Sequence, residues 1–239
     1  MQDIQAVIMA GGKGARLRPY TLVLPKPMMP VGDQPVIEIL IKWLRRWGVK
    51  QVFITTGYLG HLITALCGDG KQWGLDIIYT REPEPLGTIG ALRLLQAYLT
   101  DTFVVMNGDL LTDLDLGALV ALHRQRKGLV TIAVNHKPIA IDLGVLENEN
   151  GRLSAFREKP TLSFQVSMGI YCLEPSVLDL IPQNVPFGFD SLMHEMLLRD
   201  LPVYLYKHDG LWMDIGRAED FCRAQESFVR EDMSRVLGA

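Results

Sequence analysis

The feature that most constrains the fold of this 239-residue chain is an alternation of short β-branched runs with stretches of helical period. Runs rich in Val, Ile and Thr predict strands at residues 4–10, 51–56, 75–80 and 102–107. Apolar residues spaced three or four apart predict helices between them, at 37–47, 88–99 and 114–127. Because parallel strands need crossovers of this kind, we predict an α/β fold built on an open, doubly wound, mostly parallel sheet.

The alternation of strands and helices changes after about Leu129, where predicted strands follow one another with fewer helices between them. The pattern predicts strands at 130–135, 143–147, 153–158, 167–173 and 203–207, and helices at 190–199 and 217–229. No linker or repeat separates the two halves, so we expect a single domain over residues 1–239 with two lobes. Ligands of doubly wound sheets bind beyond the carboxyl ends of the strands, so the loops after strands should carry the site.

Composition and charge exclude several classes of protein. The net charge of −3 and the pI near 6.0 argue against nucleic-acid binding, which usually needs a basic face. The cysteines at 67, 172 and 222 are too far apart for a zinc site and indicate no disulfide framework. The N-terminal apolar run is too short for a membrane span and lacks the basic start of a signal peptide. We therefore expect a cytoplasmic protein with no nucleic-acid or membrane partner.

A glycine-rich loop follows the first predicted strand directly. Its glycines allow a tight turn that brings backbone N–H groups against an anion: Gly11, Gly12 and Gly14. The spacing departs from the dinucleotide fingerprint GxGxxG, which needs a glycine where Leu17 stands, and no GK[ST] of a Walker loop follows. A simple strand-to-helix turn would explain the glycines alone. Three cations in the same stretch favour a polyphosphate ligand: Lys13, Arg16 and Arg18.

A lysine between two prolines, in Pro25-Lys26-Pro27, follows the loop. Its stiff backbone would present the ammonium at a fixed place, although a solvated loop lysine also explains the pattern. Together, GGKGARLRPYT at 11–21 and PKP at 25–27 resemble the signature of the sugar-1-phosphate nucleotidyltransferases. The resemblance implies that Arg16 and Lys26 are catalytic. It implies nucleotide binding by Ala10, Gly11, Gly12 and Gly14.

The resemblance also implies an organisation of the chain. The fold would be a Rossmann-like nucleotidyltransferase fold with a smaller sugar-binding β lobe. Its nucleotide-binding part would span about residues 1–128 and its sugar-phosphate-binding part about 129–239. The segment at 82–92 is similar to the one that lies against the base in the family, which implies nucleotide binding by Glu82, Gly87 and Thr88. Capping of the following helix is the structural alternative for Thr88.

The sugar side of the resemblance rests on four further segments. The stretch FREKP at 156–160 matches the one that grips the sugar phosphate, and 144–145 and 169–171 correspond to segments that line the sugar pocket. The fourth is Asn-Gly-Asp at 107–109, which ends a predicted strand. Without the resemblance, 156–160 reads as an exposed charged strand end. The implied sugar-phosphate-binding residues are Asn107, Gly144, Glu158, Lys159 and Gly169.

Two aspartates match the metal positions of the family. Asp109 ends the fourth predicted strand, and Asp214 lies in GLWMDIG at 210–216. The resemblance implies that both bind Mg²⁺, a hard cation that prefers carboxylate and phosphate oxygens. Taken alone, an aspartate at a strand end is more often a turn residue. The two aspartates could meet only through the fold.

The implied reaction joins a nucleoside triphosphate to a sugar 1-phosphate and releases pyrophosphate. A phosphate oxygen of the sugar 1-phosphate, already anionic near neutral pH, would attack the α-phosphorus without a general base. Mg²⁺ on the two aspartates would bridge the reacting phosphates. Lys26 would stabilise the transition state, Arg16 would hold the leaving pyrophosphate, and Lys159 would anchor the attacking group.

The motifs look closest to those of mannose-1-phosphate guanylyltransferases, which favours GTP. Thymidylyl- and uridylyltransferases of the family often carry a Gln before the Leu-Gly segment, where Arg81-Glu82 stands here. Two sugar-pocket segments depart from the family, because Leu143 stands where Tyr is common and Ser167-Met168 where Asn-Ala is usual. Loss of polar partners weakens discrimination for a hydroxyl, so the sugar is expected to be mannose-like, heptose-like or less hydroxylated.

Other functions stay open on the sequence. A nucleotide-sugar-dependent glycosyltransferase would place its metal on paired carboxylates, and Asp113-x-Asp115 has that spacing, although a helix start also explains it. A non-catalytic nucleotide-sugar-binding regulator would have little need of the full set of candidate residues. Members of the family commonly self-associate, so a homo-oligomer is one candidate assembly, and the sequence alone does not fix the oligomeric state. Some relatives append a C-terminal repeat domain, and with the chain ending at Ala239 we expect no regulation through one.

Overall fold

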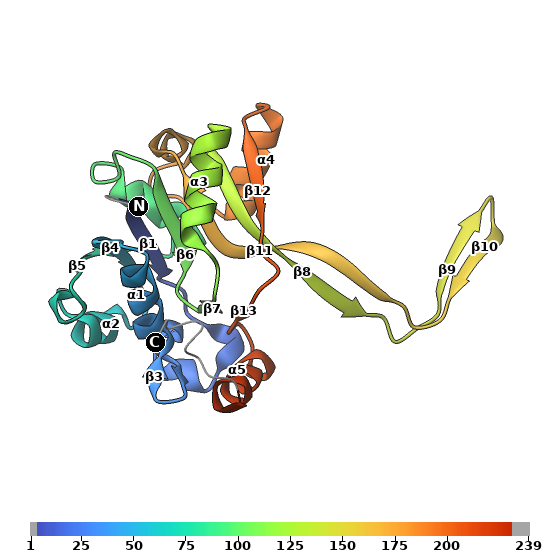
Figure 1. Ribbon diagram of the computed structural model, residues 1–239, viewed down its shortest axis with the longest axis horizontal. Helices are drawn as coiled ribbons and strands as arrows, with labels where there is room; N and C mark the ends of the chain where they lie inside the picture. Colours follow the sequence, from blue (N-terminus) through green and yellow to red (C-terminus); the bar gives the residue numbers. More distant parts are fainter. Residues whose placement is uncertain (1–3, 231–239) are drawn as a thin grey trace.

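The structure is organised around a seven-stranded sheet with strand order β12-β8-β11-β6-β1-β4-β5 (Figure 1). The computed structural model describes residues 4–230. Neighbouring strands are parallel except at β11, which runs antiparallel to both β6 and β8. The predicted α/β fold with an open, mostly parallel sheet is therefore confirmed.

The first half of the chain supplies four parallel strands and three helices. The strands are β1 Gln5–Ala10, β4 Gln51–Thr56, β5 Asp76–Arg81 and β6 Phe103–Asn107. The helices are α1 Val36–Arg46, α2 Gly60–Cys67 and α3 Leu116–Arg126. The strands and helices lie close to their predicted positions, except that the short helix α2 was not predicted. Order along the sheet reverses at β1, which has β4 on one side and β6 on the other.

The helix predicted at 88–99 is wrong in type, because this segment contains the 3-10 helix η5 Gly90–Leu95. The N–H groups of Ile89 and Gly90 both donate to the carbonyl oxygen of Phe187 at 3.2 Å, which ties the start of the segment to a distant loop. A tighter helix of this kind is usual in short pieces. The apolar spacing that suggested an α-helix reflects burial of Leu92 and Leu95 against the sheet.

Several short elements connect these larger ones. The small strands are β2 Pro30–Val31, β3 Gln34–Pro35, β7 Leu110–Thr112 and β13 Trp212–Asp214. The other 3-10 helices are η1 Ala15–Leu17, η2 Tyr20–Leu22, η3 Lys26–Met28, η4 Lys71–Trp73 and η6 Pro175–Leu180. Strand β13 pairs antiparallel with β7, so two segments about a hundred residues apart lie side by side.

Two strands of the second half, β8 and β11, are longer than the sequence predicted. Its strands are β8 Val130–Ala140, β9 Val145–Glu149, β10 Arg152–Arg157, β11 Thr161–Leu173 and β12 Val203–Lys207. Its α-helices are α4 Phe189–Leu198 and α5 Ala218–Arg230. The β9–β10 hairpin turns at Asn150-Gly151, where both residues have positive φ, as favoured two-residue hairpin turns require.

Strands β8 and β11 continue beyond the main sheet as a two-stranded ribbon, paired from Ser167 with Val134 to Thr161 with Ala140. The β9–β10 hairpin lies at the far end of this ribbon, well away from the rest of the molecule (Figure 1). We call residues 136–166 the arm and the remaining described residues the body. The sugar-binding part expected over about residues 129–239 stays a prediction; of that range, residues 136–166 form the arm, and β12 lies in the main sheet.

Helices cover both faces of the sheet, as a doubly wound fold requires. One buried cluster joins α1, α2 and α3 to the sheet, with Trp43 among its largest fully buried side chains. The other joins η5, η6 and α4 to the opposite face around Phe53 and Phe103. Between residues 4 and 230, none of the helices combines the length and the apolar character needed to cross a membrane.

Candidate active site

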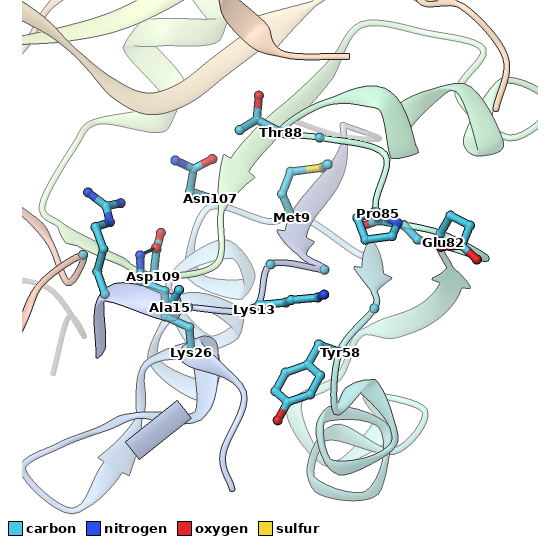
Figure 2. A pocket seen from close by; sticks show the side chains of 18 of the residues that line it. Met9, Lys13, Ala15, Lys26, Tyr58, Glu82, Pro85, Thr88, Asn107 and Asp109 are labelled. Carbon is cyan, nitrogen blue, oxygen red and sulfur yellow. Dashed lines mark ion pairs between the residues drawn. The ribbon is translucent and has the colours of Figure 1, made fainter. Parts of the chain in front are cut away.

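A cavity of about 830 Å³ lies beyond the carboxyl ends of β1, β4, β5 and β6. The loops that follow these strands line it (Figure 2). Asp214 joins them from the end of β13. This is the position, next to the strand where the order reverses, at which doubly wound sheets bind ligands. The volume falls in the range of small-molecule and cofactor sites. We take this cavity as the candidate active site and call it the pocket.

The glycine loop after β1 is in direct contact with the loop after β4. A Cβ on Gly57 would lie 2.6 Å from the carbonyl oxygen of Gly11, so a side chain there would displace the glycine loop. A Cβ on Gly11 would in turn lie 1.8 Å from Glu82 Oε1. Glycine at 57 therefore lets the loops after β1 and β4 meet backbone to backbone, and glycine at 11 leaves room for the Glu82 side chain. Gly14 begins the turn η1 with φ of 59°, in the left-handed region that favours glycine.

Glu82 stabilises the contact between these loops through hydrogen bonds. Its side chain is buried, its Oε2 accepts a hydrogen bond from the Leu86 N–H at 2.9 Å, and its own N–H donates to the carbonyl oxygen of Thr56 at 2.8 Å. Burial raises the pKa of Glu82, and the hydrogen bond from Leu86 partly offsets the shift. Glu82 thus lines the pocket while it braces the loops after β1, β4 and β5.

Gly87 and Thr88 line the pocket and also connect it to α4. Gly87 has φ of 79°, and a Cβ there would lie 2.7 Å from the carbonyl oxygen of Phe187. Thr88 Oγ1 accepts a hydrogen bond from the N–H of Phe189, the first residue of α4, at 2.8 Å. The expected alternative of capping the following helix is therefore wrong, because Thr88 caps a helix a hundred residues further along. Its hydroxyl hydrogen stays available for donation to a ligand.

Lys26 lies between the two candidate metal ligands. Its Nζ forms an ion pair with Asp109 Oδ2 and lies 3.9 Å from Asp214 Oδ1. Burial lowers the pKa of Lys26, Asp214 acts in the opposite direction, and the nearby Arg16 lowers it further. Figure 2 shows Lys26 beside Asp109 and Ala15, at the end of the pocket away from Glu82. A cation thus stands among the carboxylates where substrate phosphates are expected.

The pairing of β7 with β13 explains how two aspartates far apart in sequence meet. Asp214 stands opposite Leu110, and the N–H of Ile215 donates to the carbonyl oxygen of Asp109 at 2.9 Å. Trp212 fixes the same strand to β11 through a hydrogen bond from its Nε1 to the carbonyl oxygen of Met168 at 3.0 Å. The prediction that these aspartates could meet only through the fold agrees with this geometry.

The two aspartates fit a divalent cation. Asp109 Oδ1 is buried and, within residues 4–230, has no hydrogen-bond partner, which is costly unless a ligand satisfies it. The same residues contain no group of three or more His, Cys, Asp or Glu side chains arranged for a metal. A cation here would therefore have two protein carboxylates and take its other ligands from substrate phosphates and water. That is the usual coordination of Mg²⁺ in phosphate chemistry.

The predicted sugar-phosphate residues fall into two groups. Asn107 lines the pocket, and Gly169 packs on it so closely that a Cβ would lie 2.5 Å from Asn107 Nδ2. Gly144, Glu158 and Lys159 lie together on the arm, outside the pocket of the same chain. A Cβ on Gly144 would lie 3.4 Å from Glu158 Oε2. The predicted sugar site is therefore divided in one chain: one group of residues lies at the pocket and the other lies on the arm.

The nucleotide and metal candidates are otherwise brought together. The pocket is lined by Gly11, Gly12, Gly14, Arg16, Lys26, Glu82, Gly87, Thr88, Asp109 and Asp214. Ala10 is buried at the end of β1, just before the lining residues. Gly57 and Tyr58 also line the pocket and were not predicted from the sequence. Gly57 and Tyr58 follow β4, so the rule that loops after strands carry the site would have found them.

The paired-carboxylate motif at 113 and 115 has a structural role. Asp115 caps α3 by accepting a hydrogen bond from the Ala118 N–H at 2.7 Å. Asp113 Oδ1 lies 2.9 Å from His208 Nε2, and neither aspartate lines the pocket. The geometry therefore gives no support to a glycosyltransferase metal site at this motif, and it agrees with the interpretation of a helix start.

The fold and the pocket define a class of protein: an α/β protein with a glycine loop, clustered cations and paired carboxylates at the switch point of a doubly wound sheet. A protein-family model described as nucleotidyl transferase matches residues 5–231. The chain belongs to the nucleotidyl transferase family, and the family predicted from its motifs is confirmed.

Relatives of known sequence agree with this assignment. The chain is 35% identical to a UTP–glucose-1-phosphate uridylyltransferase of Synechocystis sp., over 98% of the chain and 65% of the relative. It is 36% identical to a mannose-1-phosphate guanylyltransferase of Mycobacterium tuberculosis, over 95% of the chain and 65% of the relative. The chain thus spans just under two thirds of the length of these curated relatives.

Solved structures share the fold. A candidate glucose-1-phosphate thymidylyltransferase from Bacillus anthracis, crystallised with a sucrose, superposes with a TM-score of 0.76 at 24% identity, covering 96% of each chain. HddC from Yersinia pseudotuberculosis superposes with a TM-score of 0.75 at 23% identity, covering 95% of this chain and all of that one. At this identity the likeness concerns the fold alone.

Proposed function

We propose that this protein transfers a nucleotidyl group from a nucleoside triphosphate to a sugar 1-phosphate and releases pyrophosphate. The observation that carries the proposal is the convergence of Lys26, Asp109 and Asp214 beside the glycine loop. An attacking phosphate and a triphosphate repel each other, so catalysis of this reaction consists mainly of positioning and charge compensation. The pocket supplies both through clustered cations and backbone N–H groups.

Each group has a distinct part in the proposed reaction. The N–H groups of the loop at 11–14 and the Arg16 guanidinium hold the β- and γ-phosphates, which leave as pyrophosphate. Lys26, desolvated and adjacent to Arg16, compensates the charge that develops at the α-phosphate. Mg²⁺ held by Asp109 and Asp214 would neutralise charge on the phosphates. No general base is required, because the attacking phosphate oxygen is already ionised near pH 7.

For the base we propose guanine, and for the sugar a mannose- or heptose-like 1-phosphate. The relatives include guanylyl- and uridylyltransferases at similar identity, so the preference for GTP rests on the motifs around Glu82 and Asp214. The pocket wall near the base includes Arg81, Glu82 and Thr88. The departures at Leu143 and Ser167 support a sugar with fewer polar contacts than the usual substrates of the family.

The test is pyrophosphate release with Mg²⁺, with each common nucleoside triphosphate crossed against a panel of sugar 1-phosphates. We expect release only when both substrates are present, with GTP and a mannose- or heptose-like 1-phosphate as the fastest pair. Lys26→Ala and Asp109→Asn should each reduce kcat on the order of 10²–10³-fold, the usual effect of removing one preorganised charge. Lys50→Ala is the matched control, because Lys50 is exposed and precedes β4, at the opposite end of the sheet.

Two results would contradict the proposal. If Lys26→Ala turned over at a near-normal rate, Lys26 would have no catalytic role in the reaction. Tight binding of a nucleotide-sugar without pyrophosphate release from any pair would instead favour a non-catalytic regulator.

A further inference from the structure

The arm exposes a row of apolar side chains that no other described residue covers. Six large apolar residues on it have relative exposures between 46% and 73%: Ile139, Leu143, Leu146, Leu153, Phe156 and Phe164. Leu146 and Phe156 stand directly opposite each other on β9 and β10. A two-stranded hairpin is at best marginally stable in water, and exposed apolar patches mark interaction sites. The arm therefore needs a partner surface.

The base of the β9–β10 hairpin is built around a strained lysine. Lys159 has φ of 42°, in the left-handed region, and precedes Pro160, which further restricts its backbone. The N–H of Ile141 donates to the carbonyl oxygen of Pro160 at 3.0 Å and holds this conformation. Phe156 packs on Gly144, where a Cβ would lie 2.8 Å from the ring. A conformation of this kind persists only where the surrounding structure holds it.

The pocket of the same chain lacks this lysine. Asn107 and Gly169 form the body's part of the predicted sugar site, whereas Gly144, Glu158 and Lys159 form the arm's part. The ribbon between them is paired continuously from Val134 to Ala140, so it extends away from the body as one element (Figure 1). Folding it back would require bending at the register shift between Ser167 and Tyr171.

We propose that two copies of this chain exchange arms, so that Lys159 and Glu158 of one copy complete the pocket of the other. The exchange rests on the proposed function, together with the sugar-phosphate contact that the family resemblance implies for Lys159. A second copy satisfies both observations together, because its body covers the apolar side chains and its pocket receives the lysine. Two-fold symmetry gives each pocket one arm and each arm one pocket.

Sedimentation velocity tests the interface without any substrate. The wild-type chain should be a dimer at micromolar concentration, and Leu146→Asp combined with Phe156→Asp should sediment as a folded monomer. Leu198→Asp is the matched control, because Leu198 on α4 is 83% exposed on the body, and this variant should remain dimeric. A monomeric wild type, or a double variant that stays dimeric, would overturn the proposal.

Complementation tests the exchange directly. Lys159→Ala carries a defective arm and Asp109→Asn a defective pocket, so each alone should lose activity on the order of 10²–10³-fold. Co-expressed with different affinity tags, the two should regain about a quarter of wild-type activity, because half of the dimers are mixed and each mixed dimer has one working site. No recovery in a mixture shown to contain mixed dimers would mean that the arm serves its own pocket.

A third measurement does not depend on catalysis. A carbodiimide joins lysine to carboxylate at contact distance, and a mixture of ¹⁴N- and ¹⁵N-labelled chains distinguishes links within a chain from links between chains. Lys159 should be linked to a pocket carboxylate in mixed-isotope pairs. Links of Lys159 confined to single-isotope pairs, or no link to the pocket, would overturn arm exchange. If the wild-type enzyme proved inactive while mixed pairs formed, the proposed function would fail and the exchange would stand.

Discussion

Single glycines decide how closely the loops of the pocket can approach. Gly57 has ordinary φ, so its requirement is spatial: a Cβ would lie 2.6 Å from the carbonyl oxygen of Gly11. That neighbour is backbone, which cannot move aside as the end of a flexible side chain can. Gly12, in the same loop, has open space within 4 Å. The two positions therefore separate the effect of crowding from the general effect of replacing glycine by alanine.

We predict that Gly57→Ala lowers the free energy of unfolding by about 1–3 kcal/mol, the usual cost of overpacking. It should also raise the KM for the nucleoside triphosphate, because the displaced glycine loop would no longer present its N–H groups correctly. Urea denaturation and steady-state kinetics provide the measurements. Gly12→Ala is the control for stability and should leave the unfolding midpoint unchanged. Equal midpoints for wild type and Gly57→Ala would show that the loop tolerates the methyl group.

At the scale of elements, the pairing of β7 with β13 sets the distance between the candidate metal ligands. Trp212 holds β13 against β11 through its hydrogen bond to the carbonyl oxygen of Met168. Trp47 offers a matched comparison, because its Nε1 is buried and has no partner in the described part of the chain. Replacing either indole by phenyl removes similar ring area, but only one replacement removes a hydrogen bond.

Trp212→Phe should therefore be less stable than Trp47→Phe by about 0.5–1.5 kcal/mol, the net contribution of one hydrogen bond. Looser placement of Asp214 should also raise the Mg²⁺ concentration needed for half-maximal activity. Thermal unfolding and a Mg²⁺ titration of pyrophosphate release measure the two effects. A Mg²⁺ requirement that rises equally in both variants would show that β13 does not position Asp214.

At the scale of the whole molecule, the sheet separates two buried layers. The reactivity of the cysteine thiols measures whether the buried layer that contains them opens. Cys67 and Cys172 are buried in the same layer, and burial raises the pKa of each thiol to about 12. Cys222 on α5 is exposed. Because the thiolate is the reactive form, native protein should react with an alkylating agent only at Cys222.

Labelling of Cys67 and Cys172 should require opening of the core, so their rates should rise together with urea concentration. The raised pKa values also make the free energy of unfolding depend on pH. The folded state binds these protons more tightly, so their contribution to stability is complete below the ordinary thiol pKa of 9.0 and is lost as pH rises towards 12. Mass spectrometry of labelled peptides measures the rates, with Cys222→Ser as the control. Fast labelling of Cys67 alone would indicate local opening of α2.

The local patterns of the sequence were sufficient to predict most elements and the chemistry of the pocket. Periodicity predicted β1, β4, β6 and α1, because burial on one face of an element makes apolar residues recur at regular intervals in the sequence. Glycine and basic residues identified the phosphate-binding loop for the same local reason. Helical periodicity gave the wrong helix type at 88–99, where the structure has a 3-10 helix whose start is hydrogen-bonded to the distant Phe187.

Only the tertiary structure decided which of the candidate residues meet. Asp109 and Asp214 come together through strand pairing between distant segments, which no local spacing encodes. Gly144 and Lys159 lie on an arm because β8 and β11 pair beyond the sheet, and the alternating apolar residues of the arm look in sequence like those of a covered sheet. The sequence determined the elements and the reactive groups, since these depend on neighbours along the chain. The structure decided their assembly, because contacts between distant segments depend on the packing of the entire molecule.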